Sequence, residues 1–217
     1  MLKKYTRIGI TGDSVTDCGR TRPVGCRNTG IGNGYAFFID TALSALYPEQ
    51  KIWIDNTGIS GNTSRALLAR FDDEVLSRNP DVLTIMIGIN NVWRHFDIGT
   101  NFPEDLKLLD IHHYESDMRK MIEKTLNTGC KLILVTPYFL ESNKNDPLRK
   151  MCDEYNAVLK KLSDEYGTYY CDVQSAFDKF MEKESAYLLS NDRVHPNSAG
   201  HYIIANELLK VLETVEL

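Results

Sequence analysis

Two nearly continuous apolar runs, within residues 82–87 and 131–136, constrain the fold of this chain more than any other feature. A parallel strand that helices cover on both faces needs such a run, whereas a strand with one wet face alternates apolar and polar residues. Further strand-like segments lie at residues 6–11, 51–55 and 168–172. The sequence therefore predicts a buried parallel sheet of about five strands.

Apolar stripes at spacings of three and four residues separate these segments and predict helices. They cover residues 35–46, 65–76, 114–126, 148–162 and 197–212. Strands that alternate with helices are typical of an α/β fold, in which a parallel sheet lies between helical layers. No shift in composition, internal repeat or low-complexity segment divides the 217 residues, so we predict a single domain over residues 1–217.

Charge and composition exclude several classes of partner. The formal net charge is -5 and the pI is about 5.6, which argues against binding to nucleic acid or to an anionic membrane. The first apolar stretch, residues 8–10, is far too short for a signal peptide, and no run approaches the length of a membrane span. We therefore expect a cytoplasmic protein without membrane association.

The cysteines favour neither a disulfide framework nor a zinc site, because their number is odd, five, and no C-x-x-C pair occurs. Cys130 and Cys171 lie in or beside apolar runs and are expected to be buried thiols. Cys18 follows closely on Ser14 and is interpreted as a small apolar wall residue rather than a redox group.

Polar residues follow three of the predicted strands at the point where each strand ends. Ser14 follows the first strand, Ser60 and Gly61 the second and Asn90 the third. Ligands of parallel α/β sheets bind beyond the carboxyl ends of the strands, so these residues should share one edge. Asp192 and His195 precede the last predicted helix, and we place them on the same side.

These residues supply the parts of a nucleophilic triad. A serine hydroxyl needs a base, His195 can provide it, and Asp192 can fix the tautomer of that imidazole. Each motif also has a simpler interpretation, since Gly-Asp-Ser suits an ordinary turn and D-x-x-H often precedes a helix cap. Together, in the order Ser14, Asp192, His195, they favour acyl transfer.

Acyl transfer also requires hydrogen-bond donors for the tetrahedral oxyanion. The candidates are the backbone N–H of Ser14, the backbone N–H of Gly61 and the side-chain amide of Asn90. Taken alone, residues 58–61 could be a flexible turn and Asn90 a turn residue or helix cap.

Four blocks in this order resemble the SGNH (GDSL) hydrolase superfamily: GDS with Ser14, GISGNT with Gly61, GINN with Asn90 and DRVH with His195. The resemblance implies a flavodoxin-like three-layer α/β/α sandwich and a serine hydrolase that needs no metal or other cofactor. It also implies that Ser14, Asp192 and His195 form the triad, with Ser14, Gly61 and Asn90 as oxyanion donors. One departure is Asn91, which stands where the family usually has Asp.

A closer resemblance is to intracellular acetylxylan esterases of this superfamily. It extends over GDSVTDCGRTRP, GNGYA, GISGNTSRALLARF, IMIGINNVWR, TPYF and DRVHPNSAGH. It implies removal of acetyl groups from xylo-oligosaccharides and assembly into a homo-oligomer. Residues expected to contact the sugar are Asp13, Trp93, Arg94 and Tyr138, with Arg20, Arg22, Arg27, Asn28 and Phe139 as further candidates. Two alternatives stay open: Trp93 is equally well a partly buried packing residue, and Tyr138 and Phe139 face either the cleft or the core.

Two other functions stay open at this point. A lysophospholipase or acyl-thioesterase would use the same triad with a long apolar acyl channel, and a carbohydrate-binding module would keep the fold without activity. A metal site is not expected, because His112 and His113 are adjacent and diverge on a helix, and His95 and His201 lack carboxylate partners at ligand spacing. The glycine cluster at 30–34 lacks the Lys-Ser/Thr of a phosphate loop, so we expect no nucleotide.

Overall fold

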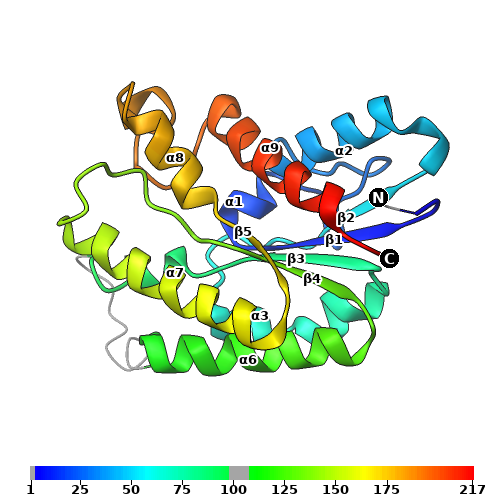
Figure 1. Ribbon diagram of the computed structural model, residues 1–217, viewed down its shortest axis with the longest axis horizontal. Coiled ribbons are helices and arrows are strands. Elements are labelled where there is room, and N and C mark those ends of the chain that lie inside the picture. Colours follow the sequence, from blue (N-terminus) through cyan, green and yellow to red (C-terminus); the bar gives the residue numbers. More distant parts are fainter. Residues whose placement is uncertain (1–2, 98–107) are drawn as a thin grey trace.

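The computed structural model describes residues 3–97 and 108–217. Its strands form one parallel sheet in the order β2-β1-β3-β4-β5 (Figure 1). The strands are β1 (Arg7–Gly12), β2 (Trp53–Asn56), β3 (Val82–Met86), β4 (Lys131–Val135) and β5 (Tyr169–Cys171). This strand order is that of flavodoxin-like folds, and the predicted parallel sheet of about five strands is confirmed.

Helices cover both faces of the sheet and make the three layers that the family resemblance implied (Figure 1). One layer contains α2 (Tyr35–Leu46), α8 (Val173–Met181) and α9 (Ser198–Thr214). The other contains α3 (Ser64–Ala69), α6 (Ile111–Asn127) and α7 (Pro147–Tyr166). Two short helices, α1 (Ser14–Asp17) and α4 (Ile89–Trp93), follow directly on strand ends.

Alternate residues of the central strands enter two separate apolar cores. In β3, Val82 and Met86 pack with α2 and α9, whereas Leu83 and Ile85 pack with α6 and α7. All four side chains are almost completely buried. Both faces of the strand are therefore dry, which is why the run at 82–87 has no polar alternation.

The long helices begin and end at residues suited to those positions. At the start of α7, Asp146 accepts hydrogen bonds from the backbone of Leu148 and Arg149, and Gly167 ends the helix at a φ of 64°. At the start of α9, Asn197 accepts from Ala199 and Gly200. Because this cap lies two residues after His195, it anchors the loop that carries the histidine.

The predicted helix at 65–76 is wrong in its second half. α3 ends at Ala69, and a π-helical turn at Phe71–Val75 and a 3-10 turn at Leu76–Arg78 follow. At the break, the Arg70 Nε donates to Asn62 Oδ1 at 2.8 Å. A contact of Arg70 with the loop that leads into α3 thus overrides the local helical pattern. The short α8 was not predicted from the sequence.

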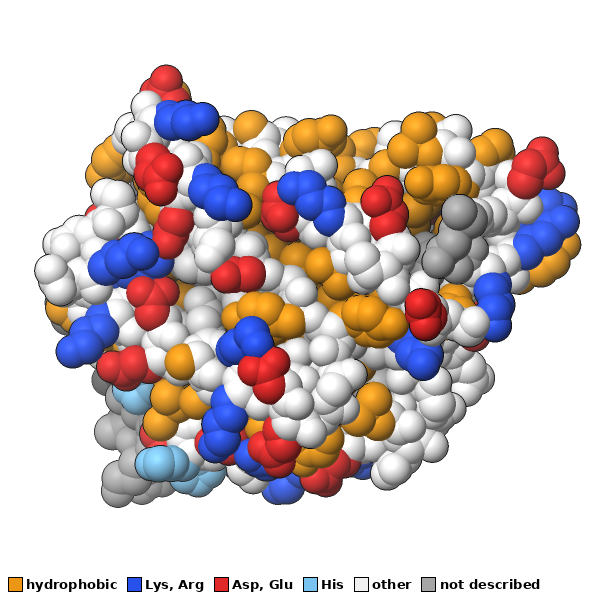
Figure 2. Space-filling model, viewed as in Figure 1, with side chains coloured by type: hydrophobic (Ala, Val, Ile, Leu, Met, Phe, Trp, Pro, Cys, Tyr) orange, Lys and Arg blue, Asp and Glu red, His pale blue; other side chains and the backbone are white. Residues whose placement is uncertain are grey.

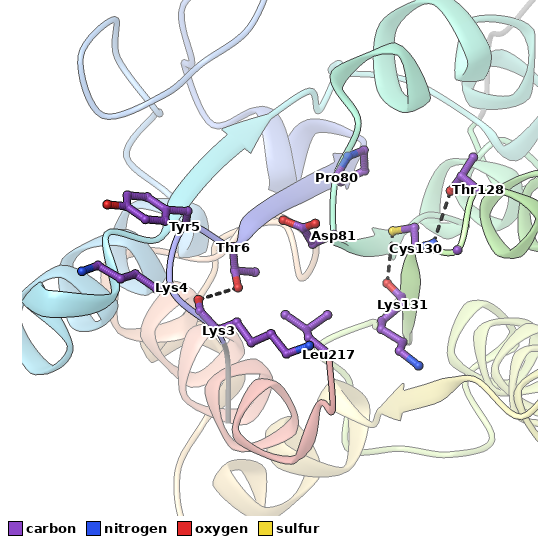
Figure 3. A pocket seen from close by; sticks show the side chains of 11 residues that line it. Lys3, Lys4, Tyr5, Thr6, Pro80, Asp81, Thr128, Cys130, Lys131 and Leu217 are labelled. Carbon is purple, nitrogen blue, oxygen red and sulfur yellow. Dashed lines mark hydrogen bonds between the residues drawn. The ribbon is translucent and has the colours of Figure 1, made fainter.

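The two ends of the sheet differ in chemistry. At the amino ends of the strands, Lys3, Lys131, Asp81 and Leu217 line a shallow depression of about 380 Å³ (Figure 3). Within it, Asp81 Oδ2 accepts a hydrogen bond from the Arg7 backbone at 2.7 Å, which ties the start of β1 to β3. Polar residues that could do chemistry gather instead at the carboxyl ends.

The surface shown in Figure 2 carries acidic and basic side chains interspersed, with no block of one sign. Apolar side chains gather along the edge formed by α2 and α9 in the same view. Exposed members of that layer include Phe37, Leu46 and Tyr202. Across residues 3–97 and 108–217, no helix has both the length and the apolar composition needed to cross a membrane.

Candidate active site

Ser14 is the first residue of α1, directly after the carboxyl end of β1. The side chain of Asp13 caps this short helix by accepting a hydrogen bond from the Val15 backbone at 3.1 Å. Gly12 allows the tight approach, because a Cβ there would lie 2.2 Å from the Met86 carbonyl oxygen. The Gly-Asp-Ser sequence therefore forms a strand-to-helix turn that presents the serine at the sheet edge.

The residues that sequence analysis placed in a triad lie together. Ser14 Oγ is 2.8 Å from His195 Nε2, and His195 Nδ1 is 2.6 Å from Asp192 Oδ2. The Asp192 carboxylate can only accept at Nδ1, so that nitrogen carries the proton and Nε2 is left to accept from the serine hydroxyl. The imidazole is in the tautomer that a general base needs.

Hydrogen bonds hold Asp192 in its ionised form. Burial opposes the charge, but the His195 ring and the backbone N–H groups of His195 and Val194 outweigh it, as does the Ser190 hydroxyl, and the pKa of Asp192 falls well below its ordinary value. Ser190 Oγ donates to Asp192 Oδ1 at 2.9 Å. Ser190 was not predicted from the sequence; a hydroxyl two residues before Asp192 is the signal that could have indicated it.

The loop of Asp192 and His195 is fixed by the segment that follows β4. The Tyr138 hydroxyl donates to the Val194 carbonyl at 3.0 Å, and the Leu140 N–H donates to the Arg193 carbonyl at 2.9 Å. The Arg193 guanidinium pairs with Glu141 at 2.7 Å. Residues remote in sequence therefore set the position of the histidine.

The candidate oxyanion donors come from two loops that meet beside Ser14. Gly61 has a φ of 81°, a left-handed conformation that glycine adopts without strain. Asn90 Nδ2 donates to the Asn62 carbonyl at 3.0 Å, which leaves its second amide hydrogen for a ligand. Among the described residues, neither the Ser14 nor the Gly61 backbone N–H has an acceptor.

Two of the predicted sugar-contacting residues lie at this site. The Trp93 ring centroid is 5.8 Å from that of His195, with the two planes inclined at 51°. Arg94 Nη2 donates to the Gly61 carbonyl at 3.1 Å. Both side chains are half-buried, so an indole face and a guanidinium flank the serine and the oxyanion loop.

The other two expected sugar contacts, Asp13 and Tyr138, are wrong because both side chains are buried, at 2% and 3% exposure. Asp13 caps α1, and the Tyr138 ring packs on Phe177 with its hydroxyl committed to Val194. Phe139, a further candidate, is also in the core. These residues support the site from behind and do not face a ligand.

The arginines proposed as hydroxyl-binding donors hold loops instead. Arg20 is buried and donates to the carbonyls of Gly58 and Pro23. Arg22 pairs with Asp17 at 2.6 Å, and Arg27 pairs with Asp40 on α2 at 2.7 Å. Asn28 is exposed and makes no described contact with the site.

Asp17 is a supporting residue that was not predicted from the sequence. Its Oδ2 accepts from the Ser60 N–H at 2.9 Å and from the Ser60 hydroxyl at 2.8 Å. Burial opposes its ionisation, yet the hydrogen bonds from Arg22 and Ser60 lower the pKa of Asp17. Asp17 therefore joins α1 to the loop that presents Gly61.

All five cysteines are unpaired thiols, and Cys130 and Cys171 are buried as predicted. Cys18 Sγ lies 3.4 Å from Nε2 of the buried His201, whose Nδ1 accepts from the Tyr35 N–H at 3.2 Å. Since Nδ1 accepts, the neutral ring carries its proton on Nε2 and donates toward the sulfur. His201 is thus in the wrong tautomer to act as a base for Cys18, and the pair does not form a second nucleophile.

Comparisons with known proteins agree with this geometry. A family model described as the GDSL-like Lipase/Acylhydrolase family matches residues 10–203. An acetylxylan esterase from Geobacillus stearothermophilus is 40% identical over 205 residues, which are 94% of this chain and 92% of that protein.

Solved structures match equally well. Axe2, an acetylxylan esterase from Geobacillus stearothermophilus, matches with a TM-score of 0.92 at 38% identity, over 99% of this chain and 96% of that one. LAE5, an alpha/beta hydrolase from the metagenome of Lake Arreo in Spain, matches with a TM-score of 0.93 at 34% identity, over 100% and 99%. Three catalytic mutants of Axe2, each with a serine, an aspartate or a histidine changed to alanine, have TM-scores of 0.92 or 0.93.

Proposed function

Because the chain belongs to the GDSL-like lipase and acylhydrolase family, we propose that it is a serine esterase that removes acetyl groups from acetylated xylo-oligosaccharides. One observation carries the proposal: Ser14, His195 and Asp192 form a continuous hydrogen-bonded chain at the carboxyl edge of the sheet. The 40% identity to an acetylxylan esterase over most of the chain supports the class of substrate.

In the first half of the reaction, Ser14 Oγ attacks the acetyl carbonyl carbon while His195 Nε2 takes the hydroxyl proton. The ionised Asp192 stabilises the imidazolium that forms. The carbonyl electrons move onto oxygen, and the N–H groups of Ser14 and Gly61 and the Asn90 amide bind this oxyanion. Each such donor contributes about 3 kcal/mol to the transition state.

The tetrahedral intermediate then collapses with cleavage of the bond to the sugar oxygen, which receives the proton from His195. An acetyl group remains on Ser14. In the second half, His195 removes a proton from water, the water oxygen attacks the acetyl carbon, and acetate leaves as Ser14 regains its proton. No group beyond this chain and water is required by these steps.

The side chains beside Ser14 favour a sugar ester over a long acyl ester. The Trp93 indole can stack on a pyranose ring, and the Arg94 guanidinium can donate to ring hydroxyls. A lysophospholipase or acyl-thioesterase would instead need a long apolar channel. The ionised acid and correctly oriented base in this triad argue against a module that only binds carbohydrate.

Hydrolysis of p-nitrophenyl acetate and octanoate tests the proposal, followed by acetate release from acetylated xylo-, manno- and chito-oligosaccharides. We expect Ser14→Ala and His195→Ala each to lower kcat at least about 10³-fold. Exposed residues of the same type supply the controls, Ser142→Ala and His112→Ala, and these should keep the wild-type rate. Full activity in either triad variant would contradict the catalytic roles, and a preference for octanoate would contradict the sugar ester.

The cytoplasmic location and the homo-oligomeric assembly that the family resemblance implies stay predictions.

A further inference from the structure

The two loops that supply the candidate oxyanion donors are joined by a second contact, one residue beyond Asn90. Asn91 Oδ1 accepts from the Ser64 N–H at 2.9 Å, and Asn91 Nδ2 donates to Ser64 Oγ at 3.0 Å. Ser64 begins α3, directly after the loop of Gly61, whereas Asn91 belongs to α4. This pair therefore helps to set the spacing between Gly61 N–H and the Asn90 amide.

The pair continues to a buried carboxylate on a third element. Ser64 Oγ donates to Asp117 Oδ2 on α6 at 3.1 Å. Ser64, Asn91 and Asp117 are all completely buried. The charge of Asp117 is balanced by Arg65, whose Nη2 lies 3.4 Å from the other carboxylate oxygen, Oδ1. That oxygen has no aligned hydrogen bond among the described residues.

The Ser64 N–H sets the direction of the hydrogen bonds in this chain when Asp117 is a carboxylate. The Ser64 N–H can only donate, so the oxygen of the Asn91 amide must face it and the NH₂ group must face Ser64 Oγ. The hydroxyl accepts from Asn91 and has one proton, which it gives to Asp117. The order is thus Asn91 Nδ2–H to Ser64 Oγ–H to Asp117 carboxylate.

With a carboxylate at position 117, this direction requires an amide at position 91, whose NH₂ group donates to Ser64 Oγ. We propose that Asp117 supplies the single buried negative charge of this contact from α6, and that Asn91, Ser64 and Asp117 together position the two oxyanion loops. The inference rests on the proposed function for its catalytic consequence. Asn91, Ser64 and Asp117 are positioning residues, since none of them reaches the substrate.

The proposal predicts which substitutions the network tolerates. In Asn91→Asp, two carboxylates face one Ser64 hydroxyl that has a single proton, and only Arg65 balances them. In Asp117→Asn, the hydroxyl can donate to the new amide oxygen, so only the pair with Arg65 is lost. In the double variant, the chain reverses: the new amide at position 117 donates to the Ser64 hydroxyl, and that hydroxyl donates to the new carboxylate at position 91.

The experiment is a double-mutant cycle of N91D, D117N and N91D/D117N, read in kcat and KM for p-nitrophenyl acetate and in thermal unfolding midpoints. We expect N91D to lower kcat about tenfold or more with little change in KM, because displaced oxyanion donors weaken transition-state binding. D117N should lose less, and the double variant should recover to the level of D117N. Asn206→Asp, a matched change at an exposed site on α9, should behave as wild type.

Wild-type kcat in N91D would overturn the proposal, and so would a double variant whose loss is the product of the two single losses. If N91D does not fold, recovery of folding and activity in the double variant supports the proposal, and a double variant that also fails to fold overturns it. The unfolding midpoints need no catalysis. A wild-type protein without turnover would therefore contradict the proposed function, while the midpoints of the cycle would still test the buried charge.

Discussion

Arg193 stands between Asp192 and His195 in a left-handed conformation, with a φ of 64°. Such a backbone costs a non-glycine residue about 1 kcal/mol. The guanidinium offsets this cost by pairing with Glu141 at 2.7 Å and by lying 4.7 Å above the Phe139 ring. These contacts tie the His195 loop to the segment after β4.

We therefore predict that Arg193→Gly separates stability from activity. Glycine relieves the backbone strain, so the thermal midpoint should change little, but the loop loses its anchor and kcat should fall about tenfold. Kinetics with p-nitrophenyl acetate, measured beside thermal unfolding, check this, and Arg193→Lys should be intermediate. An unchanged kcat in Arg193→Gly would show that the guanidinium is not needed. The hydrogen bonds that the Val194 and Arg193 carbonyls accept from the segment after β4 would then suffice to hold the His195 loop.

The residues of the candidate site differ in how well the sequence could predict them. The grouping of Ser14, Asp192 and His195 could be predicted, because a serine nucleophile needs a base and the base needs an acceptor, and few short motifs of the chain can be combined in this way. Arg20, Arg22 and Arg27 could not be placed, because a long side chain with several donors finds whichever carbonyl or carboxylate the fold brings near. Tyr138 does not contact the sugar because its side chain is buried against Phe177 of α8. The apolar pattern of the sequence did not predict α8, so this burial could not be predicted either.

At the scale of elements, the carboxyl end of β1 depends on one glycine. Gly12 lies opposite Met86 in the register of β1 and β3, and an added Cβ would lie 2.2 Å from that residue's carbonyl oxygen and 2.4 Å from Thr16 Oγ1. Gly12→Ala must therefore push α1 or β3 aside.

We expect Gly12→Ala to lower the free energy of unfolding by about 3 kcal/mol, the upper end of what overpacking typically costs, because the added Cβ meets backbone. Urea unfolding, compared with Gly129→Ala, measures it. Gly129 has a φ of 81° and open space around it, so alanine there should cost only about 1 kcal/mol. Equal losses in the two variants would mean that backbone conformation, and not the contact with β3, is what Gly12 provides.

The elements that the sequence predicted are those with a long apolar period. The strands at 82–87 and 131–136 and the helices at 35–46, 114–126, 148–162 and 197–212 are confirmed within a few residues, because burial on a sheet demands that period. The end of α3 at Ala69 was not predicted, since Arg70 bonds to Asn62 in the loop before the helix and to the Gly12 carbonyl at the end of β1. The short helix α1 was not predicted, because a single helical turn carries no period.

For the whole molecule, two buried groups on either side of the triad act on stability in opposite directions. Burial raises the pKa of Asp13 to about 7, although the Val15 N–H and the charge of His195 lower it. Burial lowers the pKa of His201 to about 4, and His195 lowers it further. In the unfolded chain the same groups titrate near about 3.9 and 6.5. Carboxyls with a lowered pKa, such as Asp17 and Asp192, stabilise the fold throughout the range between these two values. Their contribution to stability is lost only as the pH falls below the unfolded value of about 3.9.

Between pH 4.5 and 6.5, folded Asp13 keeps a proton that the unfolded chain has lost, so its contribution to stability falls as the pH rises. Folded His201 lacks a proton that the unfolded chain binds, so its contribution rises with pH. Each slope is about 1.4 kcal/mol for each pH unit, and the two nearly cancel. We therefore expect the free energy of unfolding of the wild type to be almost constant across this range.

Two substitutions separate these opposing slopes. Asp13→Asn keeps the acceptor for the Val15 N–H and removes the first slope, so stability should rise with pH. His201→Asn keeps an acceptor for the Tyr35 N–H and removes the second slope, so stability should fall with pH. Urea unfolding of the three proteins at pH 4.5, 5.5 and 6.5 measures the slopes. Parallel curves for the wild type and both variants would mean that neither buried group changes its protonation on folding.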